Sequence, residues 1–362
     1  MNNFLPPVWI TWKRRPSQAS MFAAVFSAAV LITACDRKPP DAGLHTVTID
    51  NVEPRRDVTG QIVDAHDGCL QFFNGRYYLY GTAYGNSDGF TNNHFRVYSS
   101  PDLGKWTLEG ELLKEFPPGI YCRPYVVFNP NTHKYVLWYN WYPITLDGAD
   151  RQWNGQVAVA TSDTPVGPFA IINPDVRVFG AAFRPGDGSL FVDDDGTGYY
   201  IFTAIHDGYA VCVARLTPDY LGFTGRASPI LAKGGEAPVL FRRDNLYYAL
   251  SGPLCAFCPA GSEVHVFTST APLGPFIERS QINSRSENGA LTVPAQETWV
   301  AKIPTPGGPA FIWMADRWGS CPDGIKGHDF QFWSGPLKFD TNGDILPIRN
   351  IAHWYIQRVD SD

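Results

Sequence analysis

Apolar and polar positions follow one repeated order along most of this chain: an apolar strand, a short polar turn and a strand rich in tyrosine. The clear copies are CLQFFNGRYYLYG at 69–81, YVVFNPNTHKYVLWY at 125–139, SLFVDDDGTGYYIF at 189–202 and PVLFRRDNLYYAL at 238–250. A degenerate copy, WVAKIPTPGGPAFIWM, covers 299–314. Apolar runs of this length separated by turn formers predict β-hairpins.

A second phrase follows the hairpin and completes the repeat. It reads VAVATSDTPVGPF at 157–169 and VHVFTSTAPLGPF at 264–276, with a weaker relative, RVYSSPDLGKW, at 96–106. Each unit therefore holds about four strands in about 50–60 residues, which is typical of a propeller blade. Five copies predict an all-β fold, a single five-bladed β-propeller with four strands per blade and a funnel on the central axis.

The acidic run Asp193-Asp194-Asp195-Gly196 occupies the turn of the third hairpin. The same slot holds Phe-Asn-Gly in the first hairpin, and Asp, Asn and Gly are residues that tolerate positive φ. A calcium loop is the alternative, but an EF-hand needs a longer spaced set that ends in Glu. The run is interpreted as a turn.

The N-terminus predicts export. Three basic residues precede the apolar run 21–33, which is too short to span a bilayer comfortably and ends in Leu-Ile-Thr-Ala-Cys. We interpret 1–35 as a lipoprotein-type signal peptide with Cys35 as the lipidated residue, 36–50 as a tether and 51–362 as the propeller catalytic domain. An ordinary signal peptide with a chance Cys is the alternative. The expected location is the periplasm or the cell surface, with membrane contact only through the lipid.

The net charge of the chain argues against one class of partner. The net charge is −6, and a leader with three basic and no acidic residues leaves the remainder still more acidic. Nucleic acid is therefore not an expected partner, because a phosphate backbone attracts basic proteins.

Six cysteines follow Cys35, and their pairing cannot be read from spacing. Cys255-Ala-Phe-Cys258 has neither a βα context nor a second CxxC, which favours a local disulfide or inert thiols over a redox or zinc site.

The residue that opens each inner strand should face the funnel, because the first strands of propeller blades converge on the axis. These residues are, blade by blade, Asp67, Cys122-Arg123, Asp187, Glu236 and Gln296 or Glu297. Carboxylates that repel one another raise each other's pKa, which is one way to make a general acid. An acid and a carboxylate on opposite faces of a sugar are what inverting hydrolysis of a glycosidic bond requires.

Three motifs in order resemble glycoside hydrolase family 43 over residues 60–340. Asp67 lies ten residues before Tyr77-Tyr78, Asp187 heads D-x-S-x-F-x-D-D-D-G, and Glu236-Ala-Pro precedes LFRRDNLYY. The resemblance implies a five-bladed propeller in which Asp67 is the base, Asp187 adjusts the pKa of the acid and orients it, and Glu236 is the general acid. It implies no redox or nucleotide cofactor and no catalytic metal.

Within that family the chain is most similar to the exo-β-1,3-galactanase branch, through AHDGCLQFFNGRYYLYG, CRPYVVFNPNTHKYVLWY, GEAPVLF, AQETWV and WMADRW. That branch carries Gly at the position of Asp67, Glu at the position of Cys122 and a Gln matching Gln296. This chain keeps the Gln but has Asp67 and Cys122, which weakens a galactan assignment and leaves the hydrolase assignment intact. Fructan-acting relatives are disfavoured, since they carry Arg-Asp-Pro and Glu-Cys where this chain has Arg184-Pro185-Gly186-Asp187 and Glu236-Ala237.

Other residues are candidates for binding the sugar, because sugar rings stack on aromatic planes and their hydroxyls bind polar groups. Each has a bland alternative in blade packing, an interblade salt bridge or a buried hydrogen bond. The candidates are His66, Arg123, Gln296, Arg317, Trp141 and Trp318, with Tyr84, Phe90 and Trp153 as further aromatics. His328 suggests a structural calcium in the central channel, although calcium prefers oxygen ligands.

The sequence therefore predicts an exported glycoside hydrolase that cleaves galactan, arabinan or xylan type side chains of plant or algal polysaccharides by an inverting mechanism. Its partner is an oligo- or polysaccharide. The alternative from another class is a non-catalytic glycan-binding propeller lipoprotein, which Cys122 and the pairing of Asp67 with Gln296 keep open.

Overall fold

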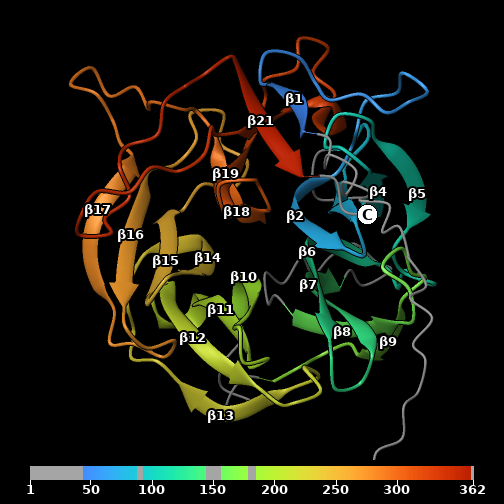
Figure 1. Ribbon diagram of the computed structural model, residues 1–362. Coiled ribbons are helices and arrows are strands. Elements are labelled where there is room, and N and C mark those ends of the chain that lie inside the picture. Colours follow the sequence, from blue (N-terminus) through green and yellow to red (C-terminus); the bar gives the residue numbers. More distant parts are fainter. Residues whose placement is uncertain (1–43, 88–92, 144–155, 178–184, 360–362) are drawn as a thin grey trace, which may run out of the picture. The chain divides into compact units, whose positions relative to one another are not determined.

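The computed structural model describes residues 44–87, 93–143, 156–177 and 185–359. Five antiparallel sheets are arranged around a central axis (Figure 1), and the predicted five-bladed all-β propeller is confirmed. Four sheets have four strands, and the fifth has three in the described part of the chain. The predicted signal peptide, which includes Cys35, lies outside the described residues. Phe90 and Trp153 also lie outside them.

The blades follow one another along the chain. Blade one holds β2 (His66–Phe73), β3 (Arg76–Ala83), β4 (His94–Ser100) and β5 (Thr107–Glu111). Blade two holds β6 (Gly119–Asn129), β7 (Lys134–Pro143), β8 (Gln156–Ser162) and β9 (Ala170–Asn173). Blade three holds β10 (Pro185–Val192), β11 (Gly198–Ala204), β12 (Ala210–Leu216) and β13 (Phe223–Ala227), with the 3₁₀ turn η1 (Ile205–Asp207).

Blade four holds β14 (Gly235–Arg243), β15 (Leu246–Pro253), β16 (Val264–Ser269) and β17 (Ile277–Asn283). Blade five holds β18 (Gln296–Ile303), β19 (Ala310–Arg317) and β20 (Phe330–Trp333), with η2 (Lys326–His328) before its last strand. The first strand of each blade lies beside the first strands of the neighbouring blades, and β18 meets β2 to close the ring.

The chain ends pair with each other. β1 (Leu44–Asp50) and β21 (His353–Val359) form a two-stranded antiparallel ribbon from Leu44↔Val359 to Asp50↔His353. Residues 44–50 were predicted to belong to the tether, and that part of the prediction is wrong. Val47 and Ile49 alternate with threonines, the period of a strand with one buried face, and Ile49 is buried.

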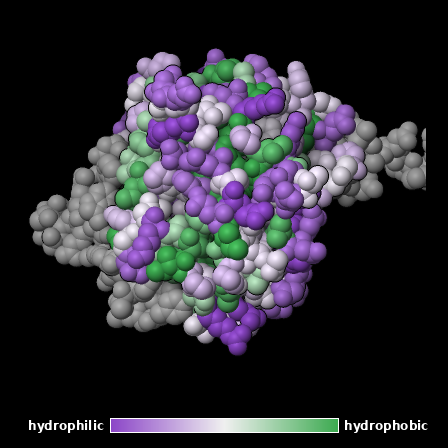
Figure 2. Space-filling model, turned by 90° about the vertical axis from the view of Figure 1, so that its left-hand side faces the viewer, coloured by the Kyte–Doolittle hydropathy of each residue, from purple (hydrophilic) through white to green (hydrophobic). Residues whose placement is uncertain are grey.

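The core consists of large side chains packed within and between blades. The largest fully buried ones include Trp106, Trp138, Trp313 and Trp333, so these four tryptophans are packing residues. The face shown in Figure 2 carries hydrophobic residues in separate patches among hydrophilic ones. Among the described residues, no helix has the length and apolar character needed to cross a membrane.

The innermost hairpin of every blade contains a register shift at the same place. The shifts lie between His66 and Cys69, Cys122 and Tyr125, Pro185 and Gly188, Glu236 and Val239, and Glu297 and Trp299. A bulge bends a strand locally and redirects the side chain that it carries. The repeat therefore supplies five inner strands and also an irregular backbone position near the head of each.

Candidate active site

One cavity of about 400 Å³ lies at the heads of the inner strands. All five blades contribute to it: Asp67 from blade one, Cys122 and Arg123 from blade two, Asp187 from blade three, Glu236 from blade four, and Gln296 from blade five. The three predicted carboxylates are therefore brought to one place. Glu297, the alternative for blade five, is fully buried and accepts a hydrogen bond from Trp313 Nε1 at 2.9 Å instead.

Asp67 sits in the bulge of β2 with a φ of 49°. Asp tolerates this left-handed conformation better than most residues. Gly68 follows it because a Cβ there would lie 1.9 Å from Tyr80 O. The amide of Asp67 donates to Asp316 Oδ2 at 2.6 Å, which fixes the backbone from behind.

The carboxylate of Asp67 is surrounded by donors. Oδ1 accepts from Thr82 Oγ1 at 2.6 Å and from the Arg123 amide at 3.2 Å, and Oδ2 accepts from the Tyr84 hydroxyl at 2.6 Å. Burial raises the pKa of Asp67 to about 6, while the charge of Arg123 and the two hydroxyl groups hold it below what burial alone would give. Asp67 is thus ionised above about pH 6 and can accept a proton near neutrality.

Asp187 is paired with a cation. Arg123 Nη2 lies 2.9 Å from Asp187 Oδ2, and Arg123 Nη1 donates to the Glu297 carbonyl at 3.1 Å. The same Asp187 oxygen accepts from the Ala237 amide at 3.2 Å, in the residue after Glu236. Arg123 lines the cavity as predicted, but its guanidinium is used to fix Asp187 and the wall.

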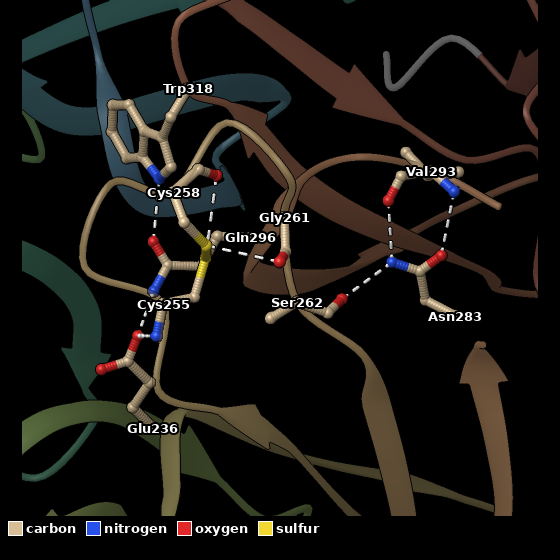
Figure 3. Close-up of a disulfide and its surroundings, with 9 residues drawn as sticks. All are labelled: Glu236, Cys255, Cys258, Gly261, Ser262, Asn283, Val293, Gln296 and Trp318. Atoms are coloured by element: carbon tan, nitrogen blue, oxygen red, sulfur yellow. Dashed lines mark hydrogen bonds between the residues drawn. A yellow bond between two sulfur atoms is a disulfide. The ribbon is translucent and has the colours of Figure 1, made fainter. Parts of the chain in front are cut away.

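Glu236 has two donors on one oxygen. Oε1 accepts from the Cys255 amide and from Gln296 Nε2, the latter at 2.7 Å, and Figure 3 shows the other oxygen directed away from both donors. Burial first, and then the charge of Asp187, raise the pKa of Glu236 to about 7. An oxygen that faces two N–H groups accepts, so the proton of the neutral acid belongs on Oε2.

Gln296 and Trp318 line the cavity as predicted and are joined to each other. Trp318 Nε1 donates to Gln296 Oε1 at 2.8 Å, which orients the amide so that its Nε2 faces Glu236. The Trp318 ring meets Tyr84 edge to face, with centroids 5.6 Å apart. These aromatic rings form one wall of the cavity.

His66 is not a substrate-binding residue in this structure. Its side chain is fully buried, with Nδ1 3.1 Å from Asp316 Oδ1 and Nε2 3.3 Å from the Gly327 carbonyl. Burial lowers the pKa of His66, but Asp316 and Asp64 outweigh burial and raise it to about 9. His66 is therefore a buried cation that holds Asp316 under the Asp67 amide, which is the buried-histidine alternative.

Two further candidates, Arg317 and Trp141, have their side chains outside the cavity. Arg317 Nη1 donates to the Asn51 carbonyl at 3.3 Å, and Nη2 donates to Asn350 Oδ1 at 2.6 Å. Trp141 stacks on Tyr121 and donates to the Pro174 carbonyl at 2.8 Å. Neither residue lines the cavity. Arg317 joins the segments next to β1 and β21 through hydrogen bonds, and Trp141 packs in blade two.

His328 does not face the channel either. It lies 2.7 Å from Asp323 Oδ2, and it lines a larger hollow of about 1110 Å³ beside blade one, together with Asp57 and Thr107. Within the described chain, Cys321, Asp323 and His328 are the one group of ligand atoms close enough to share a metal ion. His328 therefore lies away from the cavity on the axis, and a structural calcium stays a prediction.

Sequence reasoning missed the segment between β15 and β16. Leu254, Ala256 and Phe257 line the cavity, and a disulfide joins Cys255 to Cys258, the first of the two alternatives that the sequence left open. Among the described cysteines, Cys69, Cys122, Cys212 and Cys321 are free thiols. The two cysteines were the available signal, but only the fold shows that their loop reaches the axis.

Comparison with known sequences gives a family match. The sequence model of glycosyl hydrolases family 43 matches residues 62–305. An arabinoxylan arabinofuranohydrolase of Bacillus subtilis is 26% identical over 273 residues, 60% of this chain and 50% of that protein. A xylosidase/arabinosidase of Humicola insolens is 28% identical over 159 residues, 41% of this chain and 46% of that protein. The chain spans about half the length of these curated relatives.

Solved structures are similar over more of the chain. A β-1,3-galactosidase of the same family is 26% identical with a TM-score of 0.72, covering 86% of this chain and 64% of its own. An exo-β-1,3-galactanase from Clostridium thermocellum is 24% identical with a TM-score of 0.75, covering 87% of this chain and 68% of its own. The second similarity concerns the fold alone.

Proposed function

The chain belongs to glycosyl hydrolase family 43, and from this premise we propose that it is an inverting glycosidase in which Glu236 is the general acid and Asp67 the general base. The observation that carries the proposal is the contrast between two carboxyl groups in one cavity. Glu236 is protonated up to about pH 7, and Asp67 is ionised above about pH 6. Inverting hydrolysis needs one carboxyl group in each state.

The reaction follows from the donors around each group. Asp67 Oδ2 accepts one hydrogen bond, from Tyr84, and has a second lone pair for the attacking water. The water oxygen bonds to the anomeric carbon while its proton passes to Asp67. The bond to the leaving oxygen breaks as that oxygen takes the proton from Glu236 Oε2. The proton then on Asp67 returns through solvent to Glu236 before the next turnover.

Asp187 has a supporting role in this proposal. Its negative charge raises the pKa of Glu236, and Arg123 and the Ala237 amide fix its position. Burial and the charge of Asp187 outweigh the opposing charge of Arg123, so Glu236 is protonated up to about pH 7. No cofactor is part of the proposed mechanism.

We propose a side chain or chain end of a plant or algal polysaccharide as the substrate, with β-1,3-galactan tested first and arabinan and xylan next. The galactan-acting similarity covers most of this chain, while the arabinoxylan-acting relatives cover less of it. Trp318 and Tyr84 are buried in this wall, and the half-buried Phe257 ring packed against both offers aromatic surface to the apolar face of a sugar. Cys122 stands where the galactanase branch carries Glu, so the sugar must be measured.

The test uses time-resolved proton NMR of the purified full chain with β-1,3-galactan, arabinogalactan, arabinan and xylan. We expect one glycan to release a sugar whose first anomer is inverted, and Asp67→Asn and Glu236→Gln each to abolish the release. A product of retained configuration would refute the mechanism. If no glycan is cleaved but one binds, the cavity is a recognition site and the glycan-binding alternative holds.

The export proposal is tested separately. We propose that the protein is carried out of the cytoplasm and anchored through a lipid on Cys35, which follows the apolar run and its Leu-Ile-Thr-Ala. Cells fed labelled palmitate should label the protein, and Cys35→Ser should remove the label. Release of an unlabelled protein into the soluble fraction would favour the ordinary signal peptide.

A further inference from the structure

The loop between β15 and β16 reaches over the cavity next to the proposed acid. Pro253 ends β15 and Val264 begins β16, and the residues between them include the Cys255–Cys258 disulfide. Leu254, Ala256 and Phe257 of this stapled loop line the cavity. The disulfide therefore closes the part of the loop that touches the cavity.

Two routes connect the stapled loop with Glu236. The direct route is the Cys255 amide, which donates to Glu236 Oε1. The indirect route runs from the Phe257 ring, whose centroid lies 4.9 Å from that of Trp318 at right angles. Trp318 donates to Gln296, and Gln296 donates to the same Glu236 oxygen, as Figure 3 shows. The loop and the acid thus belong to one closed ring of contacts.

The base of the loop is anchored to the strand that carries Gln296. The Ser262 amide donates to the Ala295 carbonyl at 3.1 Å, directly before Gln296. Gly261 has a φ of 73°, and a Cβ there would lie 2.3 Å from the Ala295 nitrogen. The two backbones therefore approach at a distance that only glycine allows.

The outer side of the loop is held by a cation. Lys326 Nζ lies 3.9 Å from the centroid of the Phe257 ring and 4.5 Å from that of Trp318. A cation over aromatic faces attracts both rings and keeps them together. Phe257 itself has a φ of 54°, a conformation rare for a large residue that the surrounding contacts must maintain.

We propose that the Cys255–Cys258 staple is a positioning device for Glu236: it holds the Cys255 amide on one carboxyl oxygen, so that the other oxygen is presented to the leaving group. The inference rests on the proposed function of Glu236. Opening the disulfide frees the loop backbone between the two cysteines, and the amide leaves the carboxylate for part of the time. Proton donation is then slower because the acid is no longer held in one orientation.

The first test measures the acid itself without a substrate. The titration of Glu236 is followed by ¹³C NMR of glutamate-labelled protein, assigned with Glu236→Gln, in wild type and in the Cys255→Ser/Cys258→Ser variant. The amide donates to the charged form, so its loss should move the titration upward by about half a pH unit or more. An unchanged titration overturns the proposal whether or not the substrate is known.

The second test separates proton donation from binding. The probes are β-1,3-galactobiose, whose leaving group needs a proton, and 2,4-dinitrophenyl β-galactoside, whose leaving group does not. The double variant should lose about tenfold or more in kcat on the disaccharide, with KM within about twofold, and much less on the aryl galactoside. Equal losses on both probes would mean general disruption of the site and would also overturn the proposal.

Controls separate this inference from the proposed function. Dithiothreitol should reproduce the effect in wild type, reoxidation should reverse it, and the double variant should not respond. Cys321→Ser removes a thiol outside the cavity and should change neither measurement. If Glu236→Gln keeps full activity, the proposed acid is wrong. If Glu236→Gln is inactive while the double variant behaves as wild type, only the positioning role is wrong.

Discussion

At the scale of single residues, activity should depend on the charge states of Glu236 and Asp67. The base must be ionised, so kcat/KM should rise with pH through about 6, where Asp67 loses its proton. The acid must be protonated, so kcat/KM should fall as pH rises through about 7, where Glu236 loses its proton. The expected profile is a narrow bell with its maximum between these values, measured as kcat/KM against pH. A plateau that extends to pH 9 would contradict the assignment of Glu236.

The role of Glu236 can also be tested by substitution. Glu236→Gln keeps the size of the side chain but cannot donate the proton, so kcat should fall about 10²–10⁴-fold on a glycan substrate. Any residual activity should lack the alkaline limb. Glu278→Gln is the matched control, because Glu278 is half-exposed on β17 beside His265, away from the cavity. A comparable loss in the control would show that the change acts through the fold.

The Tyr84 hydroxyl should lower the pKa of the proposed base, Asp67. Its hydroxyl donates to Asp67 Oδ2 at 2.6 Å and so favours the ionised form of that carboxyl group. Tyr84→Phe should raise the pKa of Asp67 and move the acidic limb of the kcat/KM profile to higher pH, by about half a unit or more. Tyr80→Phe, on the strand β3 that precedes Tyr84, removes a hydroxyl that donates to the Pro165 carbonyl and should leave that limb unchanged. An unmoved limb in Tyr84→Phe would exclude Asp67 as the titrating base.

At the scale of elements, the acidic turn of blade three also joins two blades. Asp193 is buried, and it accepts from Arg242 Nη1 at 2.7 Å and from the Tyr247 hydroxyl at 2.6 Å, both on blade four. Asp193→Ala should lower the melting temperature by several degrees because the donors on blade four lose their acceptor. Asp194→Ala, at an exposed position of the same turn, should change it little. Added calcium should not raise the melting temperature; a rise would revive the calcium alternative.

The repeated strands also show how much of the site the sequence could predict. The repeat placed Asp67, Asp187 and Glu236 at equivalent positions, and equivalent positions of a propeller share an axis. Side-chain direction beyond the bulges was not predictable, because one residue of register turns a side chain to the other face. His66 directly precedes Asp67 and Arg317 directly precedes Trp318 in sequence, yet His66 is buried behind Asp67 and Arg317 reaches Asn350.

At the scale of the whole molecule, the five repeats were sufficient to predict the fold, but they did not predict the pairing of the chain ends. Each repeat carries its own pattern, but β1 and β21 lie at opposite ends of the chain and neither resembles a blade strand. Their pairing is a contact between residues about 300 positions apart, which no local pattern encodes. The ribbon borders blade five, where Asn51 Nδ2 donates to the Trp333 carbonyl at 2.9 Å and Asn51 Oδ1 accepts from the Trp333 amide at 2.9 Å.

The ribbon of β1 and β21 should contribute measurably to the free energy of unfolding. Trp354 and Ile356 of β21 are buried, and Trp354 Nε1 donates to the Trp333 carbonyl at 2.8 Å. A chain that ends at Ala352 loses both side chains and leaves β1 without a partner, so its free energy of unfolding should fall by roughly 3–6 kcal/mol, given about 1.5–3 kcal/mol for each buried side chain. Urea unfolding measures the change, and a chain that ends at Val359 is the control because it keeps all of β21. Tyr355→Ser alters the exposed face of the same strand and should change the free energy of unfolding little. If the shorter chain unfolds within about 1 kcal/mol of the control, the ring of blades is stable without the ribbon, and the contacts of β18 with β2 are sufficient to close it.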